Sequence, residues 1–327
     1  MALPMKAMVL TRYGSPKQLR LRELARPEPR DHEVLVRVHA TTVNDYDWAL
    51  VRGKPRLYRV IFGLFRPRVK VLGAEVSGTV EATGRDVRGF QPGDHVYGDV
   101  SETGFGGFAQ YVCTHERALI HKPPEMTFEQ AAALPHAAML ALQGLVDVGR
   151  IRPGERILIN GAGGGVGMIG VQIAKQYGAE VTGVDRDFKL EAMRSIGFDH
   201  VIDYKREDFT RGRQRYDLIL DTKTTRSPFR YLKALNPGGR YVSVGGKLPR
   251  LLQALCLRPL LSAATGKAVR IVALKANKDL AYVNDLFERS GLACPIDGPY
   301  PLEDVAQAIQ RFGEARHIGK IVITIAE

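Results

Sequence analysis

Cysteine is scarce in this sequence. Its 327 residues contain three cysteines, Cys113, Cys256 and Cys294, which lie far apart and are odd in number. This pattern excludes a disulfide framework and a paired-cysteine metal site, and it favours a reducing setting. Long apolar runs are also missing: no segment approaches the roughly 20 apolar residues of a membrane-spanning helix, and the N-terminal run is too short for a secretory signal. We therefore expect a cytoplasmic protein that is not integral to a membrane.

What the chain has in quantity is apolar residues and positive charge. Hydrophobic residues make up 45% of it, enough for two domains with cores, and its net charge is +12. This charge favours anionic partners such as dinucleotides, nucleic acids or acidic lipid surfaces. Two stretches, 51–70 and 247–270, are both basic and apolar. Each is typical either of a basic surface above a core or of a contact with a lipophilic substrate or a membrane face.

The pattern along the chain predicts two kinds of domain. Up to about residue 125, short strand-like segments alternate with Gly and Pro, which indicates a largely β domain. A helical segment at 127–149 follows, with Thr127 as a plausible N-cap, and then apolar strands separated by helix-length segments. This alternation predicts an α/β fold with a doubly wound parallel sheet. We place the boundaries near 130 and 274, so that 275–327 returns to the β domain.

A glycine-rich turn, "INGAGGGVGMIG" at 159–170, stands between a strand and a helix. Small residues there permit a tight turn and let backbone N–H groups approach a pyrophosphate at the start of the helix. The context of strand, turn and helix predicts a Rossmann dinucleotide site. The residues expected to form it are Ala162, Gly163, Gly164, Gly165, Val166 and Gly167.

The choice of dinucleotide depends on the end of the next strand. Asp185 lies about 20 residues beyond the glycines, where a carboxylate binds the adenosine ribose of NAD. Arg186 and Lys189 follow it and can clamp the 2′-phosphate of NADP instead. The local charges leave both cofactors open.

Several strings resemble the zinc-free quinone oxidoreductase (zeta-crystallin-like) branch of the medium-chain dehydrogenase/reductase superfamily. They are "VNDYDWALVRGKP", "LGAEVSGTVEATG", "GDHVYGD", "GGFAQYV", "INGAGGGVG", "GFDHVIDYKREDF" and "GKIVITI", and they cover essentially the whole chain. The resemblance implies a GroES-like catalytic domain in 1–130 and 275–327 around a Rossmann domain in 131–274. It also implies a homodimer. Zinc-dependent members have Cys and His where this chain has Asn44 and Ala74, so we expect no metal.

The resemblance also implies roles for individual residues. Lys189 and Tyr204 match positions that contact the 2′-phosphate, which favours NADPH and leaves NADH as the alternative. Gly245, Gly246 and Lys320 match positions close to the cofactor. Asn44, Asp47 and Tyr46 occupy the active-site loop: Asn44 is expected to donate its amide to a substrate carbonyl, and Tyr46 is a candidate proton donor. For Asn44 and Asp47 the alternative is a turn held by Asx hydrogen bonds.

We therefore expect an enzyme, a zinc-independent NADPH-dependent reductase of a quinone or an enone, with a small lipophilic substrate. Two alternatives stay open: a weakly catalytic module that binds a dinucleotide or RNA, and an enoyl-thioester reductase. Asp45 and Leu140 stand where relatives usually have Pro and Thr, which keeps the weakly catalytic alternative open. No RNP, KH or zinc-knuckle signature is present, so dedicated nucleic-acid binding is not expected. Peripheral contact with a membrane is the role that the basic apolar stretches suggest.

Overall fold

The computed structural model describes residues 3–325 and divides the chain into two compact units. The first unit comprises residues up to 136 and those from 276 onward, and the second comprises 137–275. Both divisions fall slightly later in the chain than the boundaries of 130 and 274 expected from the sequence. The alanine-rich residues on both sides of the division are buried, so the hydrophobic pattern does not change there, and the one local mark is the break between two helices at Pro135.

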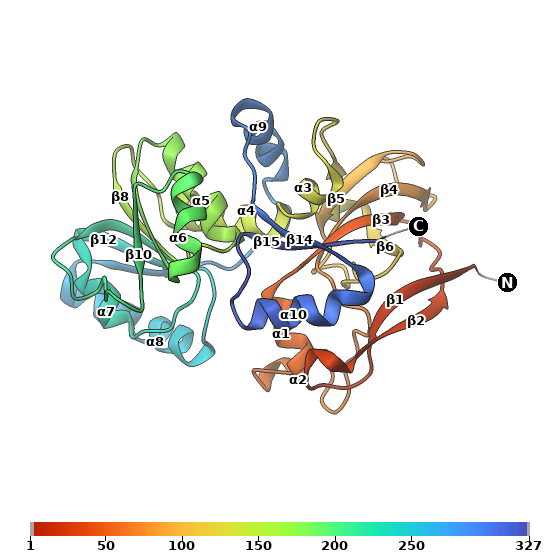
Figure 1. Ribbon diagram of the computed structural model, residues 1–327, viewed down its shortest axis with the longest axis horizontal. Helices are drawn as coiled ribbons and strands as arrows, with labels where there is room; N and C mark the ends of the chain where they lie inside the picture. Colours follow the sequence, from red (N-terminus) through yellow and green to blue (C-terminus); the bar gives the residue numbers. More distant parts are fainter. Residues whose placement is uncertain (1–2, 326–327) are drawn as a thin grey trace. The chain divides into compact units, whose positions relative to one another are not determined.

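The first unit is built on a seven-stranded sheet in which the C-terminal return supplies two strands. The strand order is β14-β15-β3-β4-β5-β7, with β6 also paired to β3 (Figure 1). A separate hairpin, β1 and β2, precedes it. The elements are β1 (Pro4–Leu10), β2 (Leu19–Ala25), β3 (Glu33–Val43), α1 (Asp45–Arg52), α2 (Leu57–Phe62), β4 (Glu75–Thr83), β5 (His95–Asp99), β6 (Tyr111–His115), β7 (Ile120–His121), α3 (Phe128–Ala132), α9 (Leu280–Ser290), β14 (Ile296–Pro301), α10 (Val305–Gly313) and β15 (Lys320–Thr324).

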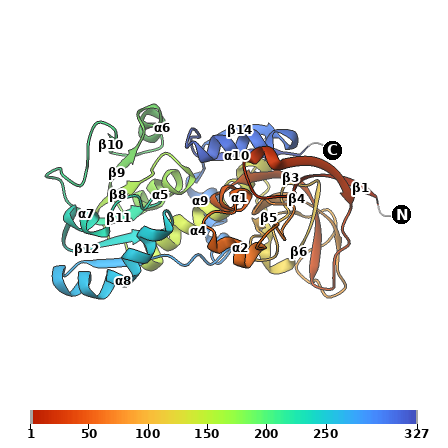
Figure 2. The same ribbon diagram turned by 90° about the horizontal axis from the view of Figure 1, so that it is seen from below.

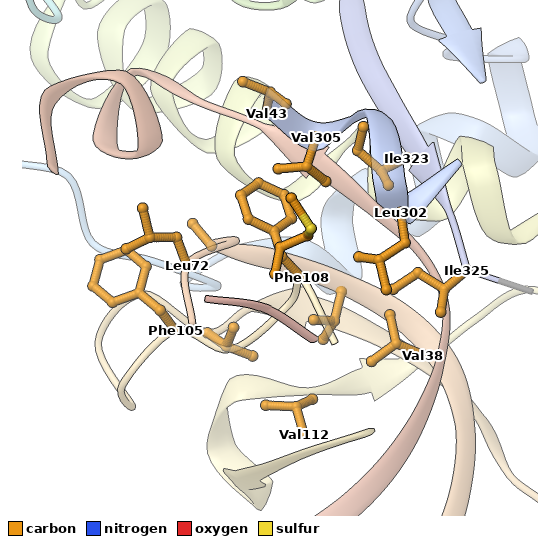
Figure 3. Packing of buried hydrophobic residues seen from close by; sticks show 14 of the residues in the cluster. Val38, Val43, Leu72, Phe105, Phe108, Val112, Leu302, Val305, Ile323 and Ile325 are labelled. Carbon is orange, nitrogen blue, oxygen red and sulfur yellow. The ribbon is translucent and has the colours of Figure 1, made fainter. Parts of the chain in front are cut away.

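The core of the first unit joins segments from both ends of the chain. Figure 3 shows Phe108 packed among Val43, Leu302 and Val305, so the C-terminal return fills the same core as the N-terminal strands. The apolar face of helix α10, which includes Ile309, packs on that core. The buried residues of the helix recur at helical spacing and so form this single face. The return of the last segment to the β-rich unit follows from this packing.

The second unit contains a parallel sheet of six strands in the order β10-β9-β8-β11-β12-β13 (Figure 2). The chain order reverses between β8 and β11, so the predicted doubly wound fold is confirmed. In such sheets ligands bind beyond the carboxyl ends of the strands at the point of reversal. The elements are α4 (Pro135–Leu142), which begins at the division, β8 (Arg156–Asn160), α5 (Gly165–Gln176), β9 (Glu180–Asp185), α6 (Leu190–Ser195), β10 (His200–Asp203), β11 (Tyr216–Asp221), α7 (Pro228–Lys233), β12 (Leu235–Ser243), α8 (Leu248–Thr265) and β13 (Ala268–Ile271).

The helical segment predicted over 127–149 is helical but broken. Thr127 caps its start, with its hydroxyl accepting a hydrogen bond from the Gln130 N–H at 3.2 Å. Pro135 has no N–H to continue a helix, so α3 stops before it and α4 begins at it. A wider π-helical turn at Gln143–Val148 ends the segment. No helix within residues 3–325 is long and apolar enough to cross a membrane.

Candidate functional site

The glycine-rich turn leaves the carboxyl end of β8 and opens α5. A Cβ built on Gly167 would lie 2.3 Å from the Ala162 carbonyl oxygen, and one built on Gly163 would lie 2.5 Å from the Lys189 side chain. Gly167 therefore lets α5 approach the turn, and Gly163 leaves room for the Lys189 side chain. This bare backbone at the start of a helix of twelve residues leaves N–H groups and the positive end of the helix dipole available for an anion.

Asp185 at the end of β9 is tied to this turn. Its Oδ2 accepts a hydrogen bond from the Gly163 N–H at 2.9 Å, and its Oδ1 accepts one from the Arg186 N–H at 2.9 Å. The buried ammonium of Lys189 lies 3.8 Å from Asp185 Oδ1. The carboxylate that would repel a 2′-phosphate is therefore paired with a cation inside the chain.

Arg186 and Tyr204 lie together at the surface beside Asp185. The Arg186 Nε donates to the Tyr204 hydroxyl at 3.0 Å, and this hydrogen bond is the main reason that the pKa of Arg186 is raised. The Tyr204 N–H donates to the Asp185 carbonyl at 3.1 Å, which fixes the two strand ends next to each other. The structure thus brings together the four residues that the sequence named for choosing between the dinucleotides: Asp185, Arg186, Lys189 and Tyr204.

Gly245 and Gly246 form a second glycine turn, separated by one residue from the end of β12. Gly246 has a φ of +122°, and a Cβ there would lie 2.3 Å from the Lys223 carbonyl oxygen. The hydroxyl of Thr224 donates to the Gly245 carbonyl at 2.5 Å. Glycine is therefore required at Gly246 by the fold, and Gly245 is held in place at the carboxyl end of the sheet.

In the first unit a buried polar network surrounds Glu75, at the start of β4. The Lys320 ammonium, at the start of β15, forms an ion pair with Glu75 Oε2 and donates to Asn44 Oδ1 at 2.6 Å. Asn44 Nδ2 donates to Glu75 Oε2 at 2.8 Å and to the Thr42 hydroxyl at 3.3 Å, and that hydroxyl in turn donates to Glu75. Lys320 is only 6% exposed. A charge buried to this degree is tolerated because it is paired and hydrogen-bonded.

The amide of Asn44, which the sequence assigned to a substrate carbonyl, is thus engaged within the chain. The contact to Thr42 is the longer of its two donor contacts. Lys320, which the sequence placed near the cofactor, belongs to this same network. The two side chains share one carboxylate, that of Glu75.

His136 continues the network on the other side of Glu75. Its backbone N–H donates to Glu75 Oε1 at 2.7 Å, and its ring lies between Asp99 Oδ2, 3.1 Å from Nδ1, and Asp45 Oδ1, 3.4 Å from Nε2. Burial disfavours the imidazolium, but the hydrogen bonds to Asp45 and Asp99 outweigh it and raise the pKa of His136 to about 10. Asp99 is fully buried, whereas the Asp45 side chain is 66% exposed, so Asp99 is the stronger partner. His136 is therefore a buried cation at neutral pH.

Asp47 holds the loop at the start of α1. Its carboxylate accepts from the Asn44 N–H at 2.8 Å and from the Gly73 N–H at 2.9 Å. Burial raises the pKa of Asp47 to about 7 in spite of these two hydrogen bonds. The geometry agrees with the alternative interpretation, in which a side-chain carboxylate secures the turn.

Tyr46 begins a row of aromatic rings that we call the ring ladder: Tyr46, Phe105, Phe62 and Tyr58. The Tyr46 ring meets the His136 ring edge-on at 5.4 Å and Phe105 at 6.0 Å. Phe62 then lies 6.2 Å from Phe105 and 6.2 Å from Tyr58, all between centroids. Burial and the nearby carboxylates of Asp45 and Asp99 raise the pKa of Tyr46 to about 12, so its hydroxyl stays protonated at neutral pH.

The sequence assigned no functional role to Glu75, Thr42, Asp99 or His136. One signal was available: Glu75 is a lone carboxylate in the otherwise uncharged run "LGAEVSG". A carboxylate in a buried strand needs a cation, and such a cation is to be sought elsewhere in the chain.

The residues of the network do not suit a metal ion. Within residues 3–325 no three His, Cys, Asp or Glu side chains are grouped so that they could hold one. The Glu75 carboxylate is paired with the Lys320 ammonium group, and Asn44 could offer a metal ion only its amide oxygen. The one imidazole of the network, that of His136, is already held between Asp45 and Asp99, so the set offers zinc no free imidazole.

A dinucleotide, by contrast, fits the turn of the second unit. The Gly163 and Gly164 N–H groups donate within the chain, so those of Gly165, Val166 and Gly167 in the first turn of α5 would bind its pyrophosphate. Arg186 with Tyr204 would bind a group on the adenosine ribose. The buried carboxylate network of one unit and this turn in the other define a dinucleotide-dependent oxidoreductase of two units.

Comparisons with known proteins agree with this class. The family model for the "Alcohol dehydrogenase GroES-like domain" matches residues 30–124, and that for "Zinc-binding dehydrogenase" matches 196–323. The chain is 31% identical over 330 residues to the 2-methylene-furan-3-one reductase of Solanum lycopersicum, covering 98% of this chain and 79% of that protein. The NADPH-dependent alkenal/one oxidoreductase of Arabidopsis thaliana, a chloroplastic protein, has the same identity and coverage. The solved quinone oxidoreductase of Coxiella burnetii superposes with a TM-score of 0.88 at 26% identity, covering 99% of this chain and 100% of that one.

The chain therefore belongs to the medium-chain dehydrogenase/reductase superfamily, within its zinc-free quinone oxidoreductase branch. The resemblance stated from the sequence motifs is confirmed.

Proposed function

We propose that this protein is an NADPH-dependent reductase that transfers a hydride to a quinone or to the activated double bond of an enone. The observation that carries the proposal is the glycine-rich turn together with Arg186 and Tyr204, in a chain whose relatives are quinone and alkenal/one oxidoreductases. When bound, the reduced nicotinamide supplies the hydride. The protein's own residues bind the cofactor and the substrate, orient them and neutralise the charge that develops.

The preference for NADPH follows from the state of Asp185. Lys189 and the Gly163 N–H both contact its carboxylate, so its charge is largely balanced inside the chain. Arg186 keeps a guanidinium at the surface beside the Tyr204 hydroxyl, where it can pair with a 2′-phosphate in two parallel hydrogen bonds. NADH remains usable, because a ribose hydroxyl can take the place of the phosphate.

For the chemical step we propose that Asn44 and Lys320 act without a metal. As a hydride arrives, negative charge develops on the carbonyl oxygen of the substrate. The Asn44 amide hydrogen that has only the 3.3 Å contact to Thr42 is the one such an oxygen would take. The ammonium of Lys320, 2.6 Å from the same side chain, supplies the positive charge that zinc supplies elsewhere. Tyr46, protonated at neutral pH, is the candidate proton donor, and Asp47 secures the loop that carries both residues.

We also propose a homodimer and a cytoplasmic location. Strand β13 stands at the edge of the six-stranded sheet, which suits a homodimer whose sheets join edge to edge. The three cysteines are free thiols, which suits the cytoplasmic location expected from the sequence, although two relatives are chloroplastic.

The segment 52–70 is the best candidate for a peripheral membrane contact. Between Asp47 and Glu75 the sequence has seven Lys and Arg residues and no Asp or Glu. Five large apolar side chains of this segment are more than half exposed, with Phe65 at 86%. Basic residues interleaved with exposed apolar ones are typical of segments that lie on anionic lipid. The five are Leu57, Val60, Ile61, Leu64 and Phe65.

The proposed function is tested by steady-state oxidation of NADPH and NADH with 9,10-phenanthrenequinone, a short enone and a crotonyl thioester. We expect NADPH to be consumed with the quinone or the enone, and the Asn44→Ala variant to lower kcat by about 100-fold with little change in the KM for NADPH. Binding of a cofactor without turnover of any substrate would reject the reductase. Turnover of the thioester alone would favour the enoyl-thioester reductase.

A further inference from the structure

The second unit contains a cavity outside the dinucleotide turn, and arginines line it. Its volume is about 290 Å³, and its lining comes from three separate segments of the chain. Asp147, Val148 and Arg150 come from the end of the π-helical turn, Arg258 from α8, and Arg270 with Ile271 from β13. We call it the arginine cavity.

Positive charge exceeds negative charge around the arginine cavity. Arg150, Arg258 and Arg270 line it, and Asp147, the one carboxylate in its lining, is itself engaged within the chain. The nearby guanidinium of Arg240 is already paired with Glu155, to which its Nη1 donates at 2.8 Å. Four guanidinium groups thus face two carboxylates, an excess that suits a ligand with at least two negative charges.

The three lining arginines act on one another. Arg270 is half-buried, with its Nη1 donating to the Val148 carbonyl oxygen. Its burial, followed by the charges of Arg150, Arg240 and Arg258, lowers the pKa of Arg270. An anion placed among these groups would relieve their repulsion while accepting hydrogen bonds from the planar forks of arginine, which match phosphate oxygens.

The cavity is separate from the dinucleotide turn. The turn leaves β8 at its carboxyl end, and β11 and β12 lie between β8 and β13, which places the two strands about 14 Å apart. The cavity's lining residues within 147–150 lie beside β12 and β13, where the Arg240 side chain of β12 donates to the Gly149 carbonyl at 2.8 Å and Arg270 of β13 donates to the Val148 carbonyl. No residue of the cavity lining belongs to the turn.

We propose that the arginine cavity binds a phosphate-bearing small molecule, such as a pyrophosphate or a phosphomonoester, independently of the dinucleotide. Its volume suits a compact ligand of this kind, and its charge favours a dianion over a monocarboxylate. This site does not depend on the proposed reductase activity.

The test is calorimetric titration of the whole protein with inorganic phosphate, pyrophosphate, sulfate and citrate at constant ionic strength. The cavity variant is Arg150→Asn with Arg258→Ala; both side chains are exposed, and Asn tolerates the φ of +53° at residue 150. The matched control, Arg194→Ala with Arg213→Ala, removes the same charge from exposed positions elsewhere in the second unit. Thermal melts check folding, and the single variant Arg258→Ala replaces the cavity variant if that protein unfolds.

We expect phosphate or pyrophosphate to bind about tenfold more weakly, or not at all, to the cavity variant, and the control to stay within about twofold of the unaltered protein. Binding of pyrophosphate but not of phosphate would identify a diphosphate as the ligand. Binding of phosphate but not of pyrophosphate would identify a phosphomonoester. Equal binding by the cavity variant and the unaltered protein, or citrate and sulfate binding as tightly as the phosphates, would overturn the proposal.

Discussion

Lys320 and Asn44 lie 276 residues apart in the chain, and the ammonium of one is 2.6 Å from the amide oxygen of the other. Both also contact Glu75, so one carboxylate orients both groups. The protein therefore holds a fixed cation and an aligned amide side by side in a buried site.

Removing the cation from this network should destabilise the fold. The Lys320→Met variant leaves the Glu75 carboxylate buried without its partner, and we expect the free energy of unfolding to fall by about 3 to 5 kcal/mol. The double variant Lys320→Met with Glu75→Gln removes both charges and should recover most of that loss. Urea unfolding measures all three proteins, and a double variant no more stable than Lys320→Met would contradict the pairing.

His136 should make stability depend on alkaline pH. Its pKa is raised from 6.5 to about 10 in the folded protein, which therefore binds the proton more tightly than the unfolded chain does. The stabilisation is fully present below pH 6.5 and is lost as the pH rises toward 10. In His136→Gln the unfolding free energy should vary less over this range. Parallel curves for the two proteins in urea melts between pH 6 and 10 would refute the imidazolium assignment.

Arg186 should discriminate between the cofactors. Because its guanidinium is placed to pair with a 2′-phosphate, Arg186→Ala should raise the KM for NADPH about tenfold and leave that for NADH nearly unchanged. Arg194→Ala, which removes an exposed arginine of α6, serves as the control. An equal loss with both cofactors would show that Arg186 contacts a part that they share.

The glycine-rich turn should not accept even a methyl group at Gly167. A Cβ there meets Ala162 backbone atoms at 2.3 to 2.6 Å, and backbone cannot move aside cheaply. We expect Gly167→Ala to weaken dinucleotide binding by at least about tenfold, measured by quenching of protein fluorescence. Gly212→Ala is the matched control, since a Cβ there meets nothing closer than 3.7 Å. Tight binding by Gly167→Ala would mean that turn and helix separate more easily than the packing indicates.

The segment 52–70 should bind anionic vesicles through both charge and apolar contact. Sedimentation with phosphatidylcholine vesicles that contain phosphatidylglycerol should retain the protein at low salt and release it as salt rises. Phe65→Ser should weaken this binding about tenfold, since one exposed aromatic ring loses its burial in lipid. Phe188→Ser, at an exposed ring of the second unit, is the control. Binding to neutral vesicles alone would contradict the charge argument.

The parts of the site that the sequence revealed are those built from local neighbours. The glycine-rich turn and the cluster around Asp185 follow from residues close together along a strand, a turn and a helix, and their positions relative to the sheet are fixed by the βαβ unit. The network around Glu75 joins β3, β4 and β15, and no local pattern states which lysine will meet a buried carboxylate. His136 was hidden for the same reason, because both of its carboxylate partners lie far from it in the chain.

The fold could be predicted from the sequence where the hydrophobic pattern fits only one kind of secondary structure. The buried strands of the second unit could be assigned from their apolar runs, such as Tyr216–Asp221. The helix α8 was not assigned from the sequence, because leucines exposed to solvent obscure the boundary between its two faces. The same is true of α2, in which no residue is buried.

The ring ladder gives the first unit a mechanical property. Phe62 lies in α2, within the segment proposed to rest on lipid, and its ring is one contact from Phe105 and two from Tyr46. Tyr58 and Phe62 are half-buried in α2, so the contact of Phe62 with Phe105 ties this exposed helix to the buried part of the row. The row thus joins the segment proposed to rest on lipid to the Tyr46 ring that meets His136, and attachment of that segment would act on the packing around the proposed proton donor.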